Sequence, residues 1–206
     1  MFLSRLVFLV FFVCAVGVQP AMAAGKTSPD EASKFLQVLG DQAVDLLGDG
    51  SLPLSEREEK IRNLLRKNFD LKTIGRFVLS KAWRTTPAEQ REEYLGLFSE
   101  FVVRTYARRL GGYAGERFKI TSAKPLGRRD ALVVTQIKRQ AGPVLSAGWR
   151  VRKKENGHKI IDVMVEGVSM AAAQRSEFES IVRKQGVGGL IEILRAKVST
   201  FSAKSS

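Results

Sequence analysis

The stretch that decides the fold is DVMVEGVS, residues 162–169. The β-branched residues of its first half favour a strand, and Gly167 ends that strand. Ser169 then stands where its side-chain oxygen can cap a following helix. Asp162 and Glu166 share one face of the strand, because strand side chains alternate. This spacing favours an ordinary strand-to-helix junction with two solvated acids over a catalytic acid pair.

The longer run DVMVEGVSMAAAQRSEF, residues 162–178, resembles the signature of the MlaC family, also called the toluene-tolerance auxiliary family. A second matching block covers residues 70–94, and a third consists of Tyr106 with residues 110–115. Together they extend the resemblance over nearly all of the mature chain. Family members are periplasmic carriers that hold a phospholipid by its acyl chains, and this chain is therefore expected to do the same.

The chain departs from the family pattern at two places. Ser80 stands where the family usually has glycine, and His158 or Lys159 stands where it usually has an aromatic residue. The run MAAAQ, residues 170–174, is also similar to HpnM, the branch associated with hopanoid synthesis. The ligand is therefore either a phospholipid or a hopanoid.

The resemblance also implies partners and a role. The partners are an inner-membrane ABC-type lipid transporter complex, which includes a substrate-binding ring protein, and an outer-membrane lipoprotein complex. Shuttling lipid between them maintains outer-membrane lipid asymmetry. The resemblance implies no cofactor and no enzymatic activity.

The N-terminus has the three parts of a secretory signal peptide. Residues 1–5 are basic, residues 6–18 are apolar but short for a bilayer span, and residues 21–23 read Ala-Met-Ala. We expect cleavage after residue 23, a single lipid-binding domain over residues 24–201, and a polar tail over residues 202–206. A retained membrane anchor is the less favoured alternative.

Charge and cysteine content agree with export to the periplasm. The one cysteine, Cys14, lies in the signal peptide, so the mature chain has no thiol for a disulfide or a metal. Removal of Arg5 lowers the formal net charge from +13 to +12. A basic protein attracts anionic partners, and export makes an anionic lipid a better partner than nucleic acid.

Helix signals dominate the first half of the mature chain. Ser28 precedes a proline and two acids, Ser55 and Glu58 form a capping box, and Asp70 stands before a third helix. A long fourth helix begins after Thr86 and ends near residue 111.

The second half changes to strand periodicity. Alternating patterns with short connections predict about four antiparallel strands after residue 115, the last of them preceded by an Asn-Gly turn at residues 156–157. Closing helices follow over residues 168–185 and 190–198. The expected fold class is α+β, with a curved antiparallel sheet packed by N-terminal and C-terminal helices around a lipid-sized apolar cavity.

The fourth helix carries a wider apolar band than one core-facing stripe requires. It faces either a core on one side and a cavity on the other, or protein on both sides. Periodicity nominates these lipid-binding residues: Phe77, Val78, Phe98, Phe101, Val102, Tyr106, Val133, Trp149, Val151, Val163 and Val165.

Few residues could support catalysis. His158 is the one histidine, and it lies beside a turn between charged residues. With no second histidine and no mature cysteine, a metal site is not expected. The glycine-rich residues 186–189 lack a P-loop lysine and follow a helix. An enzyme is therefore disfavoured, and the remaining alternative to a carrier is a periplasmic accessory protein that binds partners through its basic surface.

Overall fold

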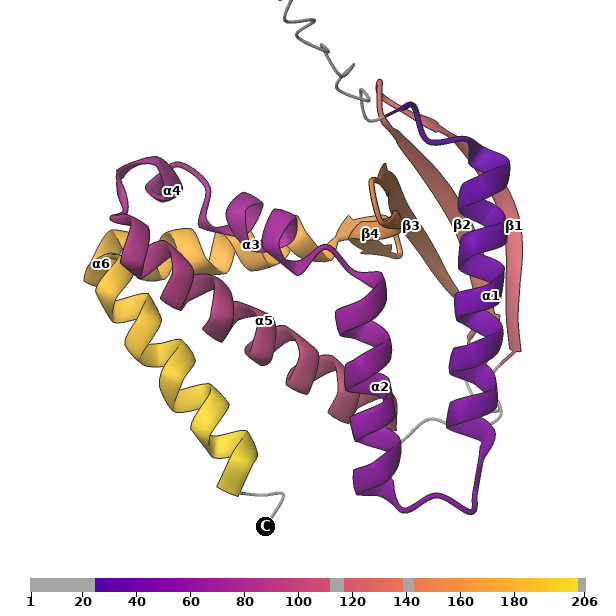
Figure 1. The fold of residues 1–206 in the computed structure, drawn as a ribbon, viewed down its shortest axis with the longest axis horizontal. Helices are drawn as coiled ribbons and strands as arrows, with labels where there is room; N and C mark the ends of the chain where they lie inside the picture. Colours follow the sequence, from indigo (N-terminus) through magenta and orange to yellow (C-terminus); the bar gives the residue numbers. More distant parts are fainter. Residues whose placement is uncertain (1–24, 112–116, 139–142, 204–206) are drawn as a thin grey trace, which may run out of the picture.

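The computed structural model describes residues 25–111, 117–138 and 143–203. In this part of the chain, five helices precede one block of strands and one long helix follows it (Figure 1). The helices are α1 (Pro29–Gly48), α2 (Leu54–Asn68), α3 (Leu71–Leu79), α4 (Ala82–Thr85), α5 (Ala88–Gly111) and α6 (Met170–Ala203). The strands are β1 (Arg117–Leu126), β2 (Asp130–Lys138), β3 (Leu145–Lys154), β4 (Gly157–Val165) and β5 (Val168–Ser169).

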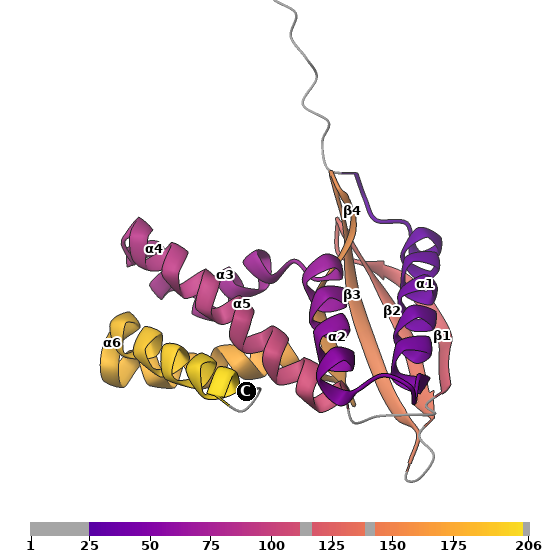
Figure 2. The same cartoon turned by 60° about the horizontal axis from the view of Figure 1, so that its bottom comes forward.

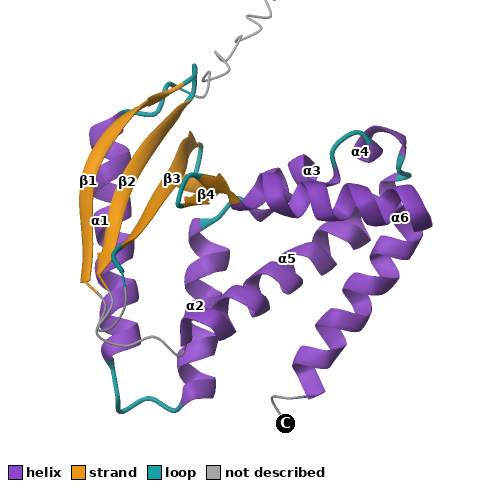
Figure 3. Cartoon of the chain, turned by 180° about the vertical axis from the view of Figure 1, so that it is seen from behind, coloured by secondary structure: helices purple, strands orange, loops and turns teal. Residues whose placement is uncertain are grey.

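The strands form one open antiparallel sheet in the order β1-β2-β3-β4-β5 (Figure 3). Each strand therefore pairs with its neighbour in sequence, which short connections favour. The predicted α+β class with a curved antiparallel sheet is confirmed. The sheet has one short strand more than the four predicted, because β5 is a two-residue strand that sequence periodicity could not detect.

A tight turn between β4 and β5 explains that extra strand. Its two residues, Glu166 and Gly167, both have positive φ (48° and 81°), as a type I′ turn requires. Val165 consequently pairs with Val168, and α6 begins at Met170 instead of at residue 168.

The two acids of the deciding stretch have structural roles. Asp162 accepts hydrogen bonds from the Ser169 hydroxyl at 2.6 Å and from the Ala171 amide at 3.1 Å. Ser169 in turn caps α6 by accepting from the Ala172 amide at 3.0 Å, as predicted. Glu166 accepts from the Ser146 amide at 2.7 Å. Asp162 therefore joins β4 to the start of α6, and Glu166 fixes the β4–β5 turn to β3.

The predicted caps of the other helices agree with the structure at some helix starts and differ from it at others. Ser28 and Asp70 cap α1 and α3 as predicted. The predicted capping box at Ser55 is wrong, since α2 begins one residue earlier, after Pro53, without a side-chain cap. The Thr86 hydroxyl donates to the Ala82 carbonyl, so it closes α4. The two closing helices form one kinked element, whose kink is at Gly186 (φ 70°).

Two hydrophobic cores lie in different halves of the molecule. The helical core, between α3, α5 and α6, contains Val78, Leu79, Tyr94, Phe98, Phe178, Leu190, Ile191 and Leu194. The sheet core, between α1 and the inner face of the sheet, contains Ala32, Leu36, Leu39, Ala131, Val133, Val151 and Ile160. Figures 1 and 2 show the helical half extending away from the sheet, with α2 between the two halves.

Several predictions fall on residues that the structure does not describe. These are the signal peptide at residues 1–23, most of the family block at residues 110–115 and the last three residues of the polar tail. No helix among the described residues is long and apolar enough to cross a bilayer.

Candidate functional site: an apolar cavity between two cores

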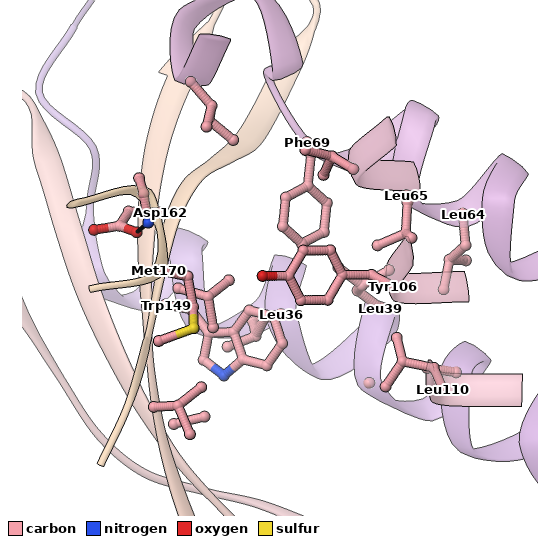
Figure 4. A pocket seen from close by; sticks show the side chains of 18 of the residues that line it. Leu36, Leu39, Leu64, Leu65, Phe69, Tyr106, Leu110, Trp149, Asp162 and Met170 are labelled. Carbon is pink, nitrogen blue, oxygen red and sulfur yellow. Dashed lines mark hydrogen bonds between the residues drawn. The ribbon is translucent and has the colours of Figure 1, made fainter. Parts of the chain in front are cut away.

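A cavity of about 390 Å³ lies where the two cores meet, and it is partly open to solvent (Figure 4). Its walls come from α1, α2, α3, α5, the first turns of α6 and the inner face of the sheet. It is lined by Leu36, Leu39, Gly40, Ala43, Val44, Leu47, Leu64, Leu65, Phe69, Leu71, Ile74, Val78, Phe98, Val102, Tyr106, Leu110, Phe118, Ile137, Leu145, Ala147, Trp149, Asp162, Val163, Val165, Met170, Ala171 and Gln174.

Three of the polar side chains in the lining are engaged by the protein, whereas the Tyr106 hydroxyl points into the cavity (Figure 4) and makes no hydrogen bond to the described residues. Both Asp162 carboxylate oxygens accept the hydrogen bonds that cap α6. The Gln174 amide donates to Glu177 at 2.9 Å, and the Trp149 indole N–H donates to the Thr135 hydroxyl at 2.9 Å. Apart from the Tyr106 hydroxyl, the surface left for a ligand is therefore hydrocarbon and aromatic rings, which suits an apolar ligand.

Helix α5 presents different faces to the cavity and to the helical core. Phe98, Val102, Tyr106 and Leu110 recur every four residues and line the cavity. Phe101 is on another face, with its ring centroid 6.4 Å from that of Phe178 in α6. The wide apolar band thus serves a cavity on one side and a protein core on the other, which settles the alternative that the sequence left open.

Seven of the eleven nominated residues lie in the cavity wall: Val78, Phe98, Val102, Tyr106, Trp149, Val163 and Val165. They come from α3, α5, β3 and β4, which the fold brings together. Their contact with lipid remains a prediction.

The other four nominated residues lie away from the cavity. Val133 and Val151 are fully buried in the sheet core, under α1. Phe101 packs against α6, and Phe77 is 45% exposed on the outer surface of α3. Strand and helix periodicity identifies which face of an element is apolar. It does not identify whether protein, solvent or a cavity lies against each position, and the four assignments differ from the structure for this reason.

The eleven nominated residues do not include the wall formed by α1 and α2. Leu36, Leu39 and Leu47 belong to an apolar stripe of α1, and Leu64 lies on the apolar side of α2. An apolar stripe looks the same whether it faces a core or a cavity. The one additional signal was Val44, which widens the α1 stripe.

Gly40 allows α1 to approach β1 closely. A Cβ at this position would lie 2.6 Å from the Phe118 ring, nearer than atoms can pack. Both residues line the cavity, so this contact defines its boundary between α1 and the sheet.

A polar joint fixes the segment between α2 and α3 to the sheet. The Asp70 amide donates to the Ile160 carbonyl at 2.9 Å, and its carboxylate pairs with Lys154 at 2.7 Å. Burial alone would raise the pKa of Asp70, but hydrogen bonds from Lys154 and Thr73 keep that pKa below its usual value. The neighbours of Asp70 in sequence, Phe69 and Leu71, both line the cavity, so the joint positions two wall residues.

A second polar cluster stabilises the sheet beyond the cavity. The Asp130 side chain is 3% exposed and pairs with Arg152 at 2.5 Å and Arg150 at 2.6 Å. Burial would raise its pKa, and the hydrogen bonds from the two guanidinium groups outweigh that effect and lower it. In the helical half, Tyr94 donates its hydroxyl to the Gly75 carbonyl at 3.0 Å, and burial raises its pKa.

The described residues contain no cluster of three or more His, Cys, Asp or Glu side chains that could hold a metal ion. His158 lies against the Phe35 ring, with centroids 5.8 Å apart, and within 3.4 Å of Glu31. It therefore packs at the start of α1 and does not enter the cavity wall.

Fold and cavity together define a class: α+β proteins whose helices and curved sheet enclose an apolar, ligand-sized space. The family model for the MlaC protein matches residues 37–196, so the chain belongs to the MlaC family. A curated relative from Haemophilus influenzae, the intermembrane phospholipid transport system binding protein MlaC, is 31% identical over 201 residues, covering 92% of this chain and 93% of the relative. The fold is also similar, with a TM-score of 0.72 and 19% identity, to a phospholipid-binding protein from Ralstonia solanacearum solved in complex with a phospholipid; the match covers 85% of this chain and 99% of that one.

Proposed function

We propose that this protein is a periplasmic lipid carrier, which holds a phospholipid by its acyl chains and shuttles it between inner- and outer-membrane complexes. The observation that carries the proposal is the cavity: a space of about 390 Å³ with an almost wholly apolar lining, in which the one carboxylate, Asp162, is hydrogen-bonded within the protein. Membership of the MlaC family supports the same conclusion.

The energetic demand on such a carrier is large. Each buried methylene contributes about 0.8 kcal/mol to the free energy that holds a lipid in a bilayer. For a lipid with about thirty methylenes, the protein must therefore supply roughly 25 kcal/mol of burial free energy in place of the bilayer. A shallow apolar patch cannot supply that, whereas a cavity walled on several sides can. We assign acyl-chain contact to the seven nominated wall residues and to the α1 and α2 wall.

The transport role extends the proposal to the cell envelope. We propose that residues 1–23 direct export and are removed, and that lipid passes between an inner-membrane ABC-type transporter complex and an outer-membrane lipoprotein complex. The protein acts in this scheme as a binding protein and not as an enzyme.

Mass spectrometry of an organic extract of the purified mature protein tests the ligand. We expect a diacyl phospholipid at about one molecule per protein. Hopanoid without phospholipid would instead support the HpnM-like interpretation of residues 170–174. An extract without lipid would favour a non-carrier accessory protein.

A second measurement tests export. The intact mass of protein from a periplasmic extract should correspond to a chain that begins at residue 24. A membrane-bound protein that retains residues before 24 would contradict the proposal of a soluble carrier.

A further inference from the structure

The outer surface of α3 and α4 combines positive charge with aromatic rings. Residues 71–91 contain five basic residues and one acidic residue, Glu89. We call Arg76, Phe77, Lys81, Trp83 and Arg84, together with Arg91 and Arg175 beside them, the α3–α4 surface. In both Figure 1 and Figure 2, α4 lies at the end of the helical half that is farthest from the sheet.

Two cation–aromatic stacks organise this surface. The guanidinium carbons of Arg76 and Arg91 both lie 5.2 Å from the centroid of the Trp83 ring. The guanidinium carbon of Arg175 lies 5.4 Å from the centroid of the Phe77 ring, which is 45% exposed. The stacks adjoin each other because Arg76 and Phe77 are consecutive in α3.

Most positive charges on this surface are not neutralised by the protein. Within the described part of the chain, Arg76, Lys81 and Arg84 form no ion pair with a carboxylate, and Arg175 pairs with Glu179 at 2.9 Å. Arginines elsewhere, such as Arg62 and Arg195, each pair with two carboxylates. Stacking on a ring orients a guanidinium without using its N–H donors. Arg91 also donates to the Arg84 carbonyl at 3.1 Å and Arg175 to Glu179, so Arg76 is the stacked arginine that donates to no acceptor among the described residues.

We propose that the α3–α4 surface docks the carrier on a bilayer that displays anionic headgroups. Arginine binds lipid phosphate through two parallel hydrogen bonds, and tryptophan favours the headgroup level of a membrane. The partly exposed Phe77 adds an apolar contact at the same place.

The position of this surface fits a carrier. Helix α3 is shared between the surface and the cavity, because Ile74 and Val78 line the cavity while Arg76 and Phe77 are exposed. Docking through α3 therefore places a bilayer against a helix that forms part of the cavity wall. This inference rests on the proposed carrier function, and it names the surface through which the carrier meets a membrane.

Vesicle flotation with the mature chain, residues 24–206, tests the proposal. The probes are phosphatidylcholine vesicles with and without one quarter phosphatidylglycerol. We expect binding to the anionic vesicles only, and we expect it to weaken as salt rises, because the attraction falls off within a Debye length. A wild-type protein that does not bind anionic vesicles overturns the proposal.

Two matched triple variants locate the surface. Arg76→Gln with Lys81→Gln and Arg84→Gln removes three charges from it, and should weaken vesicle binding at least tenfold. Lys119→Gln with Lys124→Gln and Lys138→Gln removes three exposed charges from β1 and β2, and should change binding less than threefold. Equal losses in both variants would show that only total charge matters and would overturn the assignment.

Two further readouts complete the test. Phe77→Ala should weaken binding to anionic vesicles and leave the extracted lipid unchanged, because Phe77 lies outside the cavity wall. Lipid content measured in every variant separates this proposal from the carrier function, since docking can fail while the cavity stays loaded. If the α3–α4 variant binds vesicles normally but loses lipid delivery to a purified partner, the surface recognises an acidic protein and the membrane proposal is wrong.

Discussion

The helical core and the sheet core differ in what fills them. In the helical core, the rings of Tyr94, Phe98 and Phe178 lie 5.7–6.5 Å apart in stacked and edge-on pairs. The fully buried residues of the sheet core are aliphatic, with valine and alanine against Leu36, Leu39 and Ile160. Aromatic side chains fill the space between three helices, whereas small aliphatic side chains hold α1 close to the sheet.

This difference explains where the cavity lies. The cavity occupies the space between the two cores, bordered by α1, α2, α5 and the inner face of the sheet. Wall residues such as Phe98 belong to a core and to the cavity at once. The same apolar residue types therefore stabilise the fold where they contact a core and are available to bind a ligand where they face the cavity.

The largest expected effect is the loss of stability caused by a charged substitution in the sheet core. Val133→Asp buries an unpaired carboxylate in a site with no exposure, and should lower the free energy of unfolding by more than about 4 kcal/mol. Thermal unfolding followed by circular dichroism measures this change. Gln136→Asp, an exposed position in the same strand, is the control and should unfold at the wild-type temperature. A folded Val133→Asp protein that has lost only its lipid would place the cavity at Val133.

The cavity should respond differently to the same substitution. Val165→Asp introduces a carboxylate that water can solvate in the partly open, empty cavity, so the protein should stay folded while co-purifying lipid falls at least tenfold. Val168→Asp is the matched control, because Val168 pairs with Val165 but is 57% exposed. Lipid extraction and thermal unfolding on both variants decide the comparison. If both variants retain lipid, Val165 is not a binding residue.

The polar cluster of the sheet half should make stability depend on pH. The pKa of Asp130 is lowered in the folded protein, so its contribution is present above the unfolded value of about 3.9 and is lost as pH falls through the folded value. Asp130→Asn should therefore cost about 2–3 kcal/mol at pH 7.

Urea unfolding of wild type and Asp130→Asn at pH 7 and below pH 4 measures this dependence. The two proteins should differ most at pH 7 and converge in acid. Asp45→Asn, at an exposed position of α1, should behave as wild type at both values. A difference that is independent of pH would show that charge at Asp130 is not the cause.

The smallest expected effect is an increase in the free energy of unfolding, caused by a substitution at the end of α3. Ser80 ends α3 with φ 57° and ψ −131°, a conformation that favours glycine. Ser80→Gly should raise the free energy of unfolding by about 0.5–1 kcal/mol, the relieved strain exceeding the added chain entropy. Ser80→Ala removes the same hydroxyl but keeps the Cβ, and should give no gain in the free energy of unfolding. Thermal unfolding separates the two variants.

The sequence by itself determined the elements whose signals are local. Ser28, Asp70 and Ser169 act as caps because a side-chain oxygen and an amide two or three residues away need only a helix start to meet. The antiparallel order of the strands followed from their short connections. The family motif at residues 162–178 indicated the lipid-binding class, and the structure gives its acids physical roles: Asp162 joins β4 to α6, and Glu166 fixes the turn after β4 to β3.

Only the tertiary structure decided which apolar faces border the cavity. Val133 and Trp149 are paired across β2 and β3, yet α1 covers the first and the cavity borders the second. Phe77 and Val78 are consecutive, yet one is on the outer surface and the other lines the cavity. The burial free energy of a side chain depends on its own apolar area, so it favours a core and a ligand pocket equally. The distinction between them comes from the distance between α5, α1 and the sheet, which no single segment of the sequence specifies.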